Sequence, residues 1–180
     1  MRLKVLLLLP LLLAAPAGAA ELTAWDIKVS SPGVLSGDFV FAGALEVRGV
    51  EMRPEGLFMP SEEFGGRTYR DVKLLSKTAY AALDAAFKAG EGEGKGKAAK
   101  KSGKVSWTVK EPRKMGGKSR KANIDVEFDG DLLVTAGLLL SNRGGEKYWI
   151  AWPRYFVFID KKLKTAVERD LLELAAKEGL

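Results

Sequence analysis

A segment rich in glycine and lysine divides this chain, and similar sequence signals follow in the same order on both sides of it. Residues 90–104 alternate glycine with charged residues and contain almost no large apolar side chain. Such a segment cannot bury enough surface to offset the entropy that is lost when a backbone becomes ordered. We therefore predict a flexible linker over 90–104, a first domain over 21–89 and a second domain over 105–180.

Each domain shows the turn signals and alternation of β-strands, followed by a helical pattern. A glycine-bearing loop is expected over 32–37, and Asp129-Gly130 is a strong hairpin signal. The predicted strands are 22–29, 38–42 and 44–52 in the first domain and 105–109, 122–128 and 132–140 in the second. The fold class is therefore α+β, with two tandem modules that each consist of an antiparallel sheet followed by a C-terminal helix.

The helical pattern that closes each domain has one apolar face. The residues on these faces are Ala79, Leu83, Ala86 and Phe87 in the first domain and Leu163, Val167, Leu171 and Leu174 in the second. Thr165-Ala-Val-Glu168 has the form of a capping box, which is typical of a helix N-terminus. Gly179 lies where a helix C-terminus favours a left-handed residue.

The first twenty residues have the features of an export signal. The first four carry two positive charges, an apolar run follows as far as Ala15, and Ala17-Gly18-Ala19 form an Ala-x-Ala cleavage site. The alternative is a membrane anchor, but the run contains proline and is shorter than the roughly 20 residues of a spanning helix. We expect a signal peptide over 1–20, cleavage near Ala19 or Ala20, and a periplasmic or secreted protein.

The first domain contains the motif Gly56-Leu57-Phe58-Met59-Pro60-Ser61 and, further on, Tyr69-Arg70-Asp71-Val72 before a helix. These two motifs resemble those of the septation protein SpoVG family, a small bacterial family. The second domain is similar to the family over 121–153, where Ala122-Asn-Ile-Asp-Val-Glu-Phe-Asp-Gly matches its second strand and turn. The resemblance implies a non-enzymatic protein, usually dimeric, that binds DNA or RNA and is tied to septation and sporulation.

The chain departs from the family pattern at three points. It carries a signal peptide, it has Glu62-Glu63 where the family often has basic residues, and it has Arg154-Tyr155 after the second proline. The first two departures weigh against nucleic-acid binding, and the third indicates that the copies have specialised. If single-copy relatives pair as homodimers, two tethered copies are expected to form an intramolecular pseudo-dimer. A homodimer of the whole chain is the alternative.

The composition argues against an enzyme. The chain contains neither histidine nor cysteine, so it lacks the commonest general base, the commonest metal ligand and the thiol nucleophile. Gly116-Gly117-Lys118-Ser119 looks like the end of a phosphate-binding loop, but Glu111 occupies the position of the required glycine. We predict no catalytic residues and no cofactor.

Four acidic residues alternate with apolar residues along one predicted strand and its turn. They are Asp125, Glu127, Asp129 and Asp131, and a strand places such residues on one face. Oxygen ligands of this kind suit hard cations, but the spacing does not match a calcium-binding loop. We predict a solvated strand face and no metal site.

Positive charge is concentrated in one part of the chain. The protein has a net charge of +6, and residues 88–121 alone contain twelve lysines and arginines against three glutamates. Such a cluster can bind phosphates, anionic lipids or acidic polymers, or it can be a charged linker and loop. The candidate residues of this basic segment are Lys110, Arg113, Lys114, Lys118, Arg120 and Lys121.

Two apolar runs end in proline, at 57–60 and at 148–153, and the turns that follow them are the other candidate binding surface. Tyrosine, tryptophan and arginine dominate binding hot spots, and residues 148–158 contain six aromatic residues. The alternative is a buried strand that packs against the final helix. The candidate residues are Arg67, Arg70, Asp71, Lys73, Arg154 and Tyr155.

These observations favour an exported binding or interaction module that acts at the cell envelope. Its expected partner is a protein or an anionic polymer. A nucleic-acid-binding regulator is the alternative, and it requires that the protein is not exported.

Overall fold

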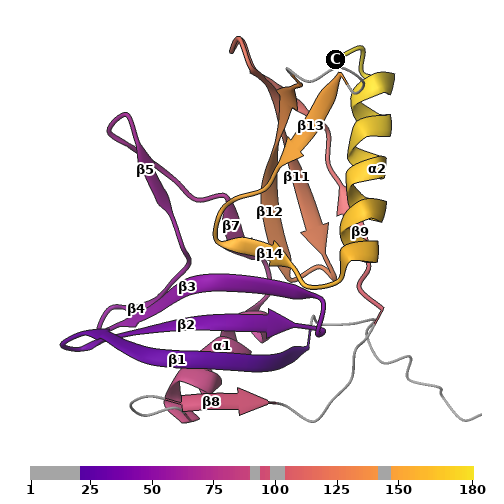
Figure 1. Ribbon diagram of the computed structural model, residues 1–180. Coiled ribbons are helices and arrows are strands. Elements are labelled where there is room, and N and C mark those ends of the chain that lie inside the picture. Colours follow the sequence, from indigo (N-terminus) through magenta and orange to yellow (C-terminus); the bar gives the residue numbers. More distant parts are fainter. Residues whose placement is uncertain (1–20, 90–93, 98–103, 142–146) are drawn as a thin grey trace, which may run out of the picture.

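The computed structural model describes residues 21–89, 94–97, 104–141 and 147–180, so the predicted signal peptide lies outside the described residues. Within these ranges the chain forms two mostly antiparallel sheets, a small ribbon and two helices, one of them C-terminal (Figure 1). The predicted combination of antiparallel sheets and helices is confirmed.

The elements are distributed as follows. The first sheet contains β1 (Leu22–Ser31), β2 (Val34–Phe41), β3 (Leu45–Arg53), β4 (Gly56–Phe58), β8 (Gly94–Lys97) and β14 (Phe156–Phe158). The second sheet contains β7 (Val72–Leu74), β9 (Trp107–Val109), β10 (Arg113–Lys114), β11 (Arg120–Phe128), β12 (Leu132–Leu140) and β13 (Tyr148–Ala151). The ribbon pairs β5 (Glu62–Phe64) with β6 (Arg67–Tyr69), and the helices are α1 (Lys77–Ala89) and α2 (Lys161–Lys177).

Tight turns with left-handed residues join the long strands of both sheets. Ala42 and Gly43, with φ of 51° and 66°, link β2 to β3, and Asp129 and Gly130, with φ of 50° and 74°, link β11 to β12. Two successive left-handed residues form the turn whose twist matches that of a hairpin. The hairpin predicted at Asp129-Gly130 is confirmed.

The loop predicted over 32–37 is wrong, because only a tight turn at Pro32-Gly33 separates β1 from β2. Gly37 lies inside β2, where the ring of Phe39 folds over it. A Cβ atom on Gly37 would come within 2.6 Å of Phe39 Cε2. The glycine that indicated a loop therefore makes room for a core side chain within a strand.

The apolar faces predicted for the helices are largely those that the structure buries. The buried residues are Ala79, Leu83, Ala86 and Phe87 in α1, as predicted, and Leu163, Val167, Leu171 and Ala175 in α2. Leu174 is only partly buried, so Ala175 replaces it in the buried face. α1 packs on the first sheet, where Phe87 and Phe39 form an edge-on contact with 5.1 Å between ring centroids.

The capping box predicted at Thr165 is wrong, because α2 begins one turn earlier. The carboxylate of Asp160 accepts hydrogen bonds from the backbone N–H groups of Lys162 and Leu163, at 2.8 and 3.2 Å. An aspartate in this position caps a helix as well as serine or threonine does. Gly179, after the helix, has the expected left-handed φ of 65°.

Each sheet includes one short strand from the opposite part of the chain (Figure 1). β7, which precedes α1, pairs with β12 in the second sheet, and β14, which precedes α2, pairs with β3 in the first. The buried apolar residues of both sheets form one cluster. The stretches before and after the predicted linker therefore share a hydrophobic core.

Part of the segment predicted as a flexible linker forms a strand instead. Residues 94–97 are β8, which pairs with β1, while 90–93 and 98–103 lie outside the described residues. The indole ring of Trp25 lies against Gly96, where a Cβ atom would come within 2.0 Å of the ring. An aromatic ring can cover a strand in this way only where the neighbour is glycine. The glycine content that favoured a linker thus also permits this contact.

Candidate functional site

A groove of about 440 Å³ opens where residues from both parts of the chain meet beside the first sheet. We call it the junction groove. Its walls come from β3, β4, β5 and the loops that precede β7 and β14. The lining residues are Gly49, Glu51, Arg53, Phe58, Met59, Pro60, Ser61, Glu63, Arg70 and Tyr155.

Tyr155 reaches the groove from the loop before β14 and its ring lies against Gly49. A Cβ atom on Gly49 would lie 3.7 Å from Tyr155 Cδ1, and the φ of this glycine is 69°. Gly49 N donates to Asp38 Oδ1 at 2.9 Å, and Arg48 N donates to the carbonyl of Tyr155 at 2.8 Å. The irregularity in β3 at Gly49 thus determines where the tyrosine ring lies.

Arg154 stabilises Tyr155 rather than lining the groove. Its guanidinium lies over the Tyr155 ring, 4.5 Å from the centroid, and donates a hydrogen bond to the Tyr155 hydroxyl. Arg154 Nε also forms an ion pair with Glu62 Oε1 at 2.9 Å. This contact joins the loop before β14 to the ribbon, and cation–π packing adds to it.

The two arginines of the groove lining differ in their surroundings. Arg53 is paired with Glu51 at 2.6 Å, and its guanidinium lies 4.6 Å from the centroid of the Phe58 ring. Arg70 is exposed and, among the described residues, forms no ion pair. A guanidinium has several hydrogen-bond donors in a fixed plane. Glu63 is likewise exposed and, in the described part of the chain, forms no ion pair, so Arg70 and Glu63 are the charged groups of the groove that remain available to a ligand.

Asp71 lies between the junction groove and the second sheet. It lines a small hollow with Pro60, Val72 and Tyr155, and its backbone carbonyl accepts a hydrogen bond from Thr135 N at 2.7 Å. Burial raises the pKa of the Asp71 carboxyl, although the nearby charge of Arg120 acts against this shift.

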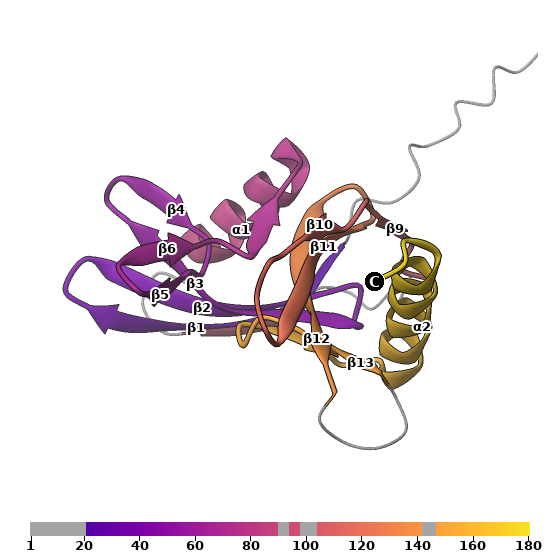
Figure 2. The ribbon, with the colours of Figure 1, turned by 90° about the horizontal axis from the view of Figure 1, so that it is seen from above.

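The structure separates two of the six predicted binding residues from the groove. Arg67 is exposed on the ribbon, which rises from the first sheet and carries Phe64 with 78% of its surface exposed (Figure 1). Seen from above, the ribbon lies on the side of the molecule remote from α2 (Figure 2). Lys73 is exposed on β7 in the second sheet. The groove thus unites Arg70 and Tyr155, with Asp71 and Arg154 beside them.

Sequence reasoning missed Arg53 and Phe58 as groove residues. Both belong to short or irregular strands, and their orientation depends on the irregularity at Gly49. The Gly-Val-Glu-Met-Arg run at 49–53 does alternate charged with apolar side chains, and this pattern predicts one exposed face. It does not predict that this face becomes a groove wall.

Most of the predicted basic segment is engaged with neighbouring groups. The contacts are Lys110 with Glu127, Arg113 with Asp125, Lys114 with the carbonyl of Glu178, Arg120 with Asn123, and Lys121 with the carbonyl of Gly117. Lys118 is exposed in the loop before β11. Among the described residues, carboxylates therefore neutralise Lys110 and Arg113, whereas Lys114, Arg120 and Lys121 contact neutral oxygens and keep their charge.

The acidic face predicted on β11 is only partly solvated. Burial alone would raise the pKa of Asp125, but hydrogen bonds from Arg113 and Thr135 and the charge of Arg113 lower it below its ordinary value. Asp129 accepts hydrogen bonds from Ser106, and Asp131 is 4% exposed. Within the described ranges, no group of three or more acidic side chains could hold a metal ion.

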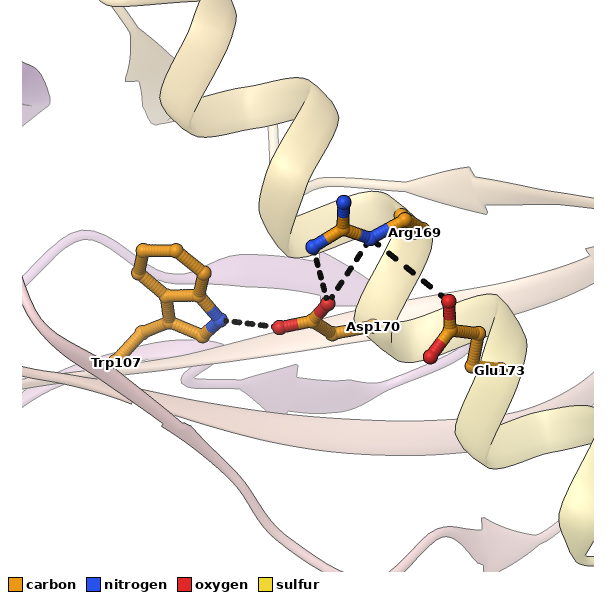
Figure 3. Close-up of polar contacts among 4 residues, drawn as sticks. All are labelled: Trp107, Arg169, Asp170 and Glu173. Atoms are coloured by element: carbon orange, nitrogen blue, oxygen red, sulfur yellow. Dashed lines mark hydrogen bonds and ion pairs between the residues drawn. The ribbon is translucent and has the colours of Figure 1, made fainter.

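Two tryptophans of the second half attach α2 to the strands. Trp107 Nε1 donates to Asp170 Oδ2 at 3.0 Å, and Arg169 pairs with Asp170 at 3.2 Å and with Glu173 at 3.8 Å (Figure 3). Trp152 Nε1 donates to Glu168 at 2.9 Å. Partly buried indole groups commonly pair in this way. Trp152 also packs against Phe156 and Phe158, so these three residues of the aromatic stretch have a structural role.

No known protein family, curated protein or solved structure matches the chain. The resemblance to the septation protein SpoVG family therefore stays a prediction. In the part of the chain that the structure describes, no helix is long and apolar enough to cross a membrane.

Proposed function

We propose that the protein is an exported, non-enzymatic binding protein built from two tandem copies of one module. The copies form a pseudo-dimer within one chain, and the junction groove between them binds a partner at the cell envelope. The observation that carries the proposal is the mutual exchange of β7 and β14, since each strand precedes a helix and joins the other copy's sheet. In a symmetric dimer, two identical subunits make the same contact with each other twice, and the two strand exchanges resemble such a pair of contacts.

The backbone hydrogen bonds next to β7 define one half of the exchange. Leu75 N, directly after β7, donates to the carbonyl of Asp131, directly before β12, at 2.7 Å. Thr135 N, from the fourth residue of β12, donates at 2.7 Å to the carbonyl of Asp71, directly before β7.

The hydrogen bonds next to β14 repeat this pattern. Ile159 N, directly after β14, donates to the carbonyl of Ala44, directly before β3, at 2.8 Å. Arg48 N, from the fourth residue of β3, donates at 2.8 Å to the carbonyl of Tyr155, directly before β14. Equivalent residues thus make equivalent bonds on both sides, which supports a duplication whose copies pack as a pseudo-dimer.

The same equivalence explains why one groove uses both copies. Arg70-Asp71 and Arg154-Tyr155 each directly precede an exchanged strand, but only one pair contains an aromatic residue. Tyr155 and Arg70 then line the same groove. Binding hot spots are typically composed of an accessible arginine beside an aromatic ring. We further propose that the partner takes part in septation, as the resemblance to the SpoVG family implies.

A nucleic-acid-binding regulator is the competing function. Glu51 and Glu63 in the groove lining weigh against it, as do the carboxylate partners of Lys110 and Arg113 in the basic segment. Carboxylates repel a phosphate backbone, whose binding depends on unpaired lysine and arginine.

Site-specific photo-crosslinking in cells tests the proposed function. A photoreactive amino acid at Met59, in the groove, is expected to give a defined adduct with an envelope component, and Arg70→Gln should weaken it. The same group at Ile159, which is 48% exposed outside the groove, serves as the control. Equal adducts at both positions, or a nucleic-acid adduct at Met59, would contradict the proposal.

Intact-mass analysis of fractionated cells tests export independently. The proposal expects a species that begins at Ala20 or Glu21 outside the cytoplasm. A cytoplasmic species that still begins at Met1 would make nucleic-acid binding the leading function.

A further inference from the structure

The second sheet has one face that α2 covers and an opposite face with a distinct row of side chains. Arg120, Leu139 and Trp149 are directly paired neighbours across β11, β12 and β13. Trp149 is 49% exposed, and Leu139 and Arg120 are partly exposed. α2 contacts β13 (Figures 1 and 2), and Ile150, next to Trp149 in this strand, is buried in the core. We call the side that carries Arg120, Leu139 and Trp149 the open face.

Arg120 is held rigidly on the open face. A Cβ atom on Gly137 would lie 3.0 Å from Arg120 Cζ and Nε, so the guanidinium lies against the glycine backbone. Arg120 Nε also donates to Asn123 Oδ1 at 2.6 Å. The absence of a side chain at Gly137 therefore leaves the space that the Arg120 guanidinium fills. Because Arg120 is already held in place, it loses little side-chain entropy when a ligand binds.

The charge of Arg120 is not neutralised by a direct partner. Its hydrogen-bond acceptor is a neutral amide, and among the described residues it forms no ion pair. The other charges on this face largely cancel, because Arg113 pairs with Asp125 and Lys110 pairs with Glu127.

The remaining charges are those of Lys73 and Asp71. Lys73 is exposed on β7, opposite Leu133 of β12, and Asp71, directly before β7, lies near enough to Arg120 for the guanidinium charge to act on its pKa. Arg120 and Lys73 together outweigh the single carboxylate of Asp71, so the open face keeps an excess of positive charge beside the apolar surface of Leu139 and Trp149. Charge complementarity favours an anionic ligand group next to an apolar one.

We propose that the open face binds an acidic, apolar peptide segment of a partner protein. The free Nη groups of Arg120 bind an aspartate or glutamate carboxylate, and Trp149 and Leu139 bind a neighbouring large apolar side chain. Bidentate arginine–carboxylate contact and a partly exposed tryptophan are both typical of protein recognition. This surface is separate from the junction groove, whose lining includes none of the three residues.

The acidic residues of the open face favour an acidic peptide over a polyanion such as a nucleic acid. Asp71, Asp125 and Glu127 lie among the basic residues, so successive phosphates would meet carboxylates. A peptide needs only one carboxylate at Arg120, and the rest of its contact is apolar. The test must therefore distinguish peptide binding from the binding of a single-stranded nucleic acid.

The test uses a displayed library of random dodecapeptides, selected on the purified protein and followed by affinity measurement of one enriched peptide. We expect enriched sequences to combine Asp or Glu with Leu, Phe or Trp. Arg120→Gln and Trp149→Ser should each lower the affinity about tenfold or more, the loss of one charged or aromatic hot-spot contact. Gly137→Ala should do the same without changing any charge, because it displaces the Arg120 guanidinium.

Arg169→Gln, an exposed arginine on α2, is the matched control and should leave the affinity unchanged. Near-UV circular dichroism of each variant verifies folding. If Gly137→Ala does not fold, the affinity of Arg120→Gln alone decides whether the proposal stands. The proposal is overturned if no acidic peptide is enriched, or if the open-face variants bind as the wild type does. Tighter, Arg120-dependent binding of a single-stranded 20-nucleotide DNA would also overturn it.

Discussion

Gly96 is the residue on which the pairing of β8 with β1 depends, because the Trp25 ring occupies the space where a side chain would stand. Gly96→Ala is therefore expected to lower the free energy of unfolding by about 1–3 kcal/mol, the usual cost of overpacking. Gly116→Ala is the control, since a Cβ atom there meets nothing within 4 Å. Urea unfolding measures both, and equal effects of the two substitutions would show that Trp25 does not rest on β8.

Asp125 and Asp71 are expected to influence stability with opposite signs. The pKa of Asp125 is lowered, so its ionised form stabilises the fold at pH values above the ordinary 3.8, and this contribution is lost as the pH falls through the folded pKa. The pKa of Asp71 is raised, so its ionisation opposes folding, and stability is lost as the pH rises from 3.8 through the raised folded value.

Matched asparagine variants test this pair of signs. At pH 7, Asp125→Asn should lower the free energy of unfolding by about 1–3 kcal/mol, the cost of losing hydrogen bonds to a charged group. Asp71→Asn should leave it unchanged or raise it. The destabilisation by Asp125→Asn should shrink as the pH falls below 3.8. If Asp71→Asn destabilises as much as Asp125→Asn, the raised pKa of Asp71 is not a feature of the fold.

At the scale of elements, the N-terminus of α2 could be capped by Asp160, as the structure shows, or by Thr165, as the sequence predicts. Asp160 accepts hydrogen bonds from two backbone N–H groups, whereas the Thr165 hydroxyl donates to the carbonyl of Lys161 inside the helix. Asp160→Ala is expected to cost about 1 kcal/mol of stability, as other N-cap losses do. Thr165→Ala should cost less, and a larger loss there than at Asp160 in chemical denaturation would contradict this helix start.

Elements with strong local patterns could be predicted from the sequence, and short paired elements could not. The hairpin of β11 and β12 follows from the alternation of β11, the apolar run of β12 and the turn signal Asp129-Gly130, all of which are local. β7 and β14 have three residues each, too few for a period, and their partners lie far away in the chain. Their pairing is decided by tertiary contacts that no sequence window contains.

The candidate site shows the same limit. Arg70 and Tyr155 could be identified because arginine and tyrosine after an apolar run suggest recognition. Arg53 could not be placed, because its orientation depends on Gly49, whose left-handed φ of 69° interrupts the alternation of β3. The basic segment misled for a related reason: composition counts charges, whereas the fold pairs Arg113 with Asp125 and Lys110 with Glu127.

At the scale of the whole molecule, β7 and β14 each join the sheet of the opposite part of the chain. A single apolar cluster spans both sheets, so neither half retains its full core when separated. Both halves belong to one chain, which raises their effective concentration for each other and favours these pairings within the chain over pairings between chains. The junction groove exists only in this arrangement, since Arg70 and Tyr155 come from different halves.

Paired cysteines test this central claim most directly, because the chain contains no cysteine of its own. Lys73→Cys with Leu133→Cys, and Glu46→Cys with Val157→Cys, each join residues that lie directly opposite across an exchanged strand. Such neighbours are close enough for a disulfide. The control combines Lys73→Cys with Val157→Cys, whose strands belong to different sheets.

The measurement is intact mass under non-reducing conditions after mild oxidation. We expect an intramolecular disulfide in the monomer for both cross-strand pairs and none for the control. Disulfides that form only between two chains would show that the strands are exchanged in a homodimer, and absence of both disulfides would show that the halves do not exchange strands at all.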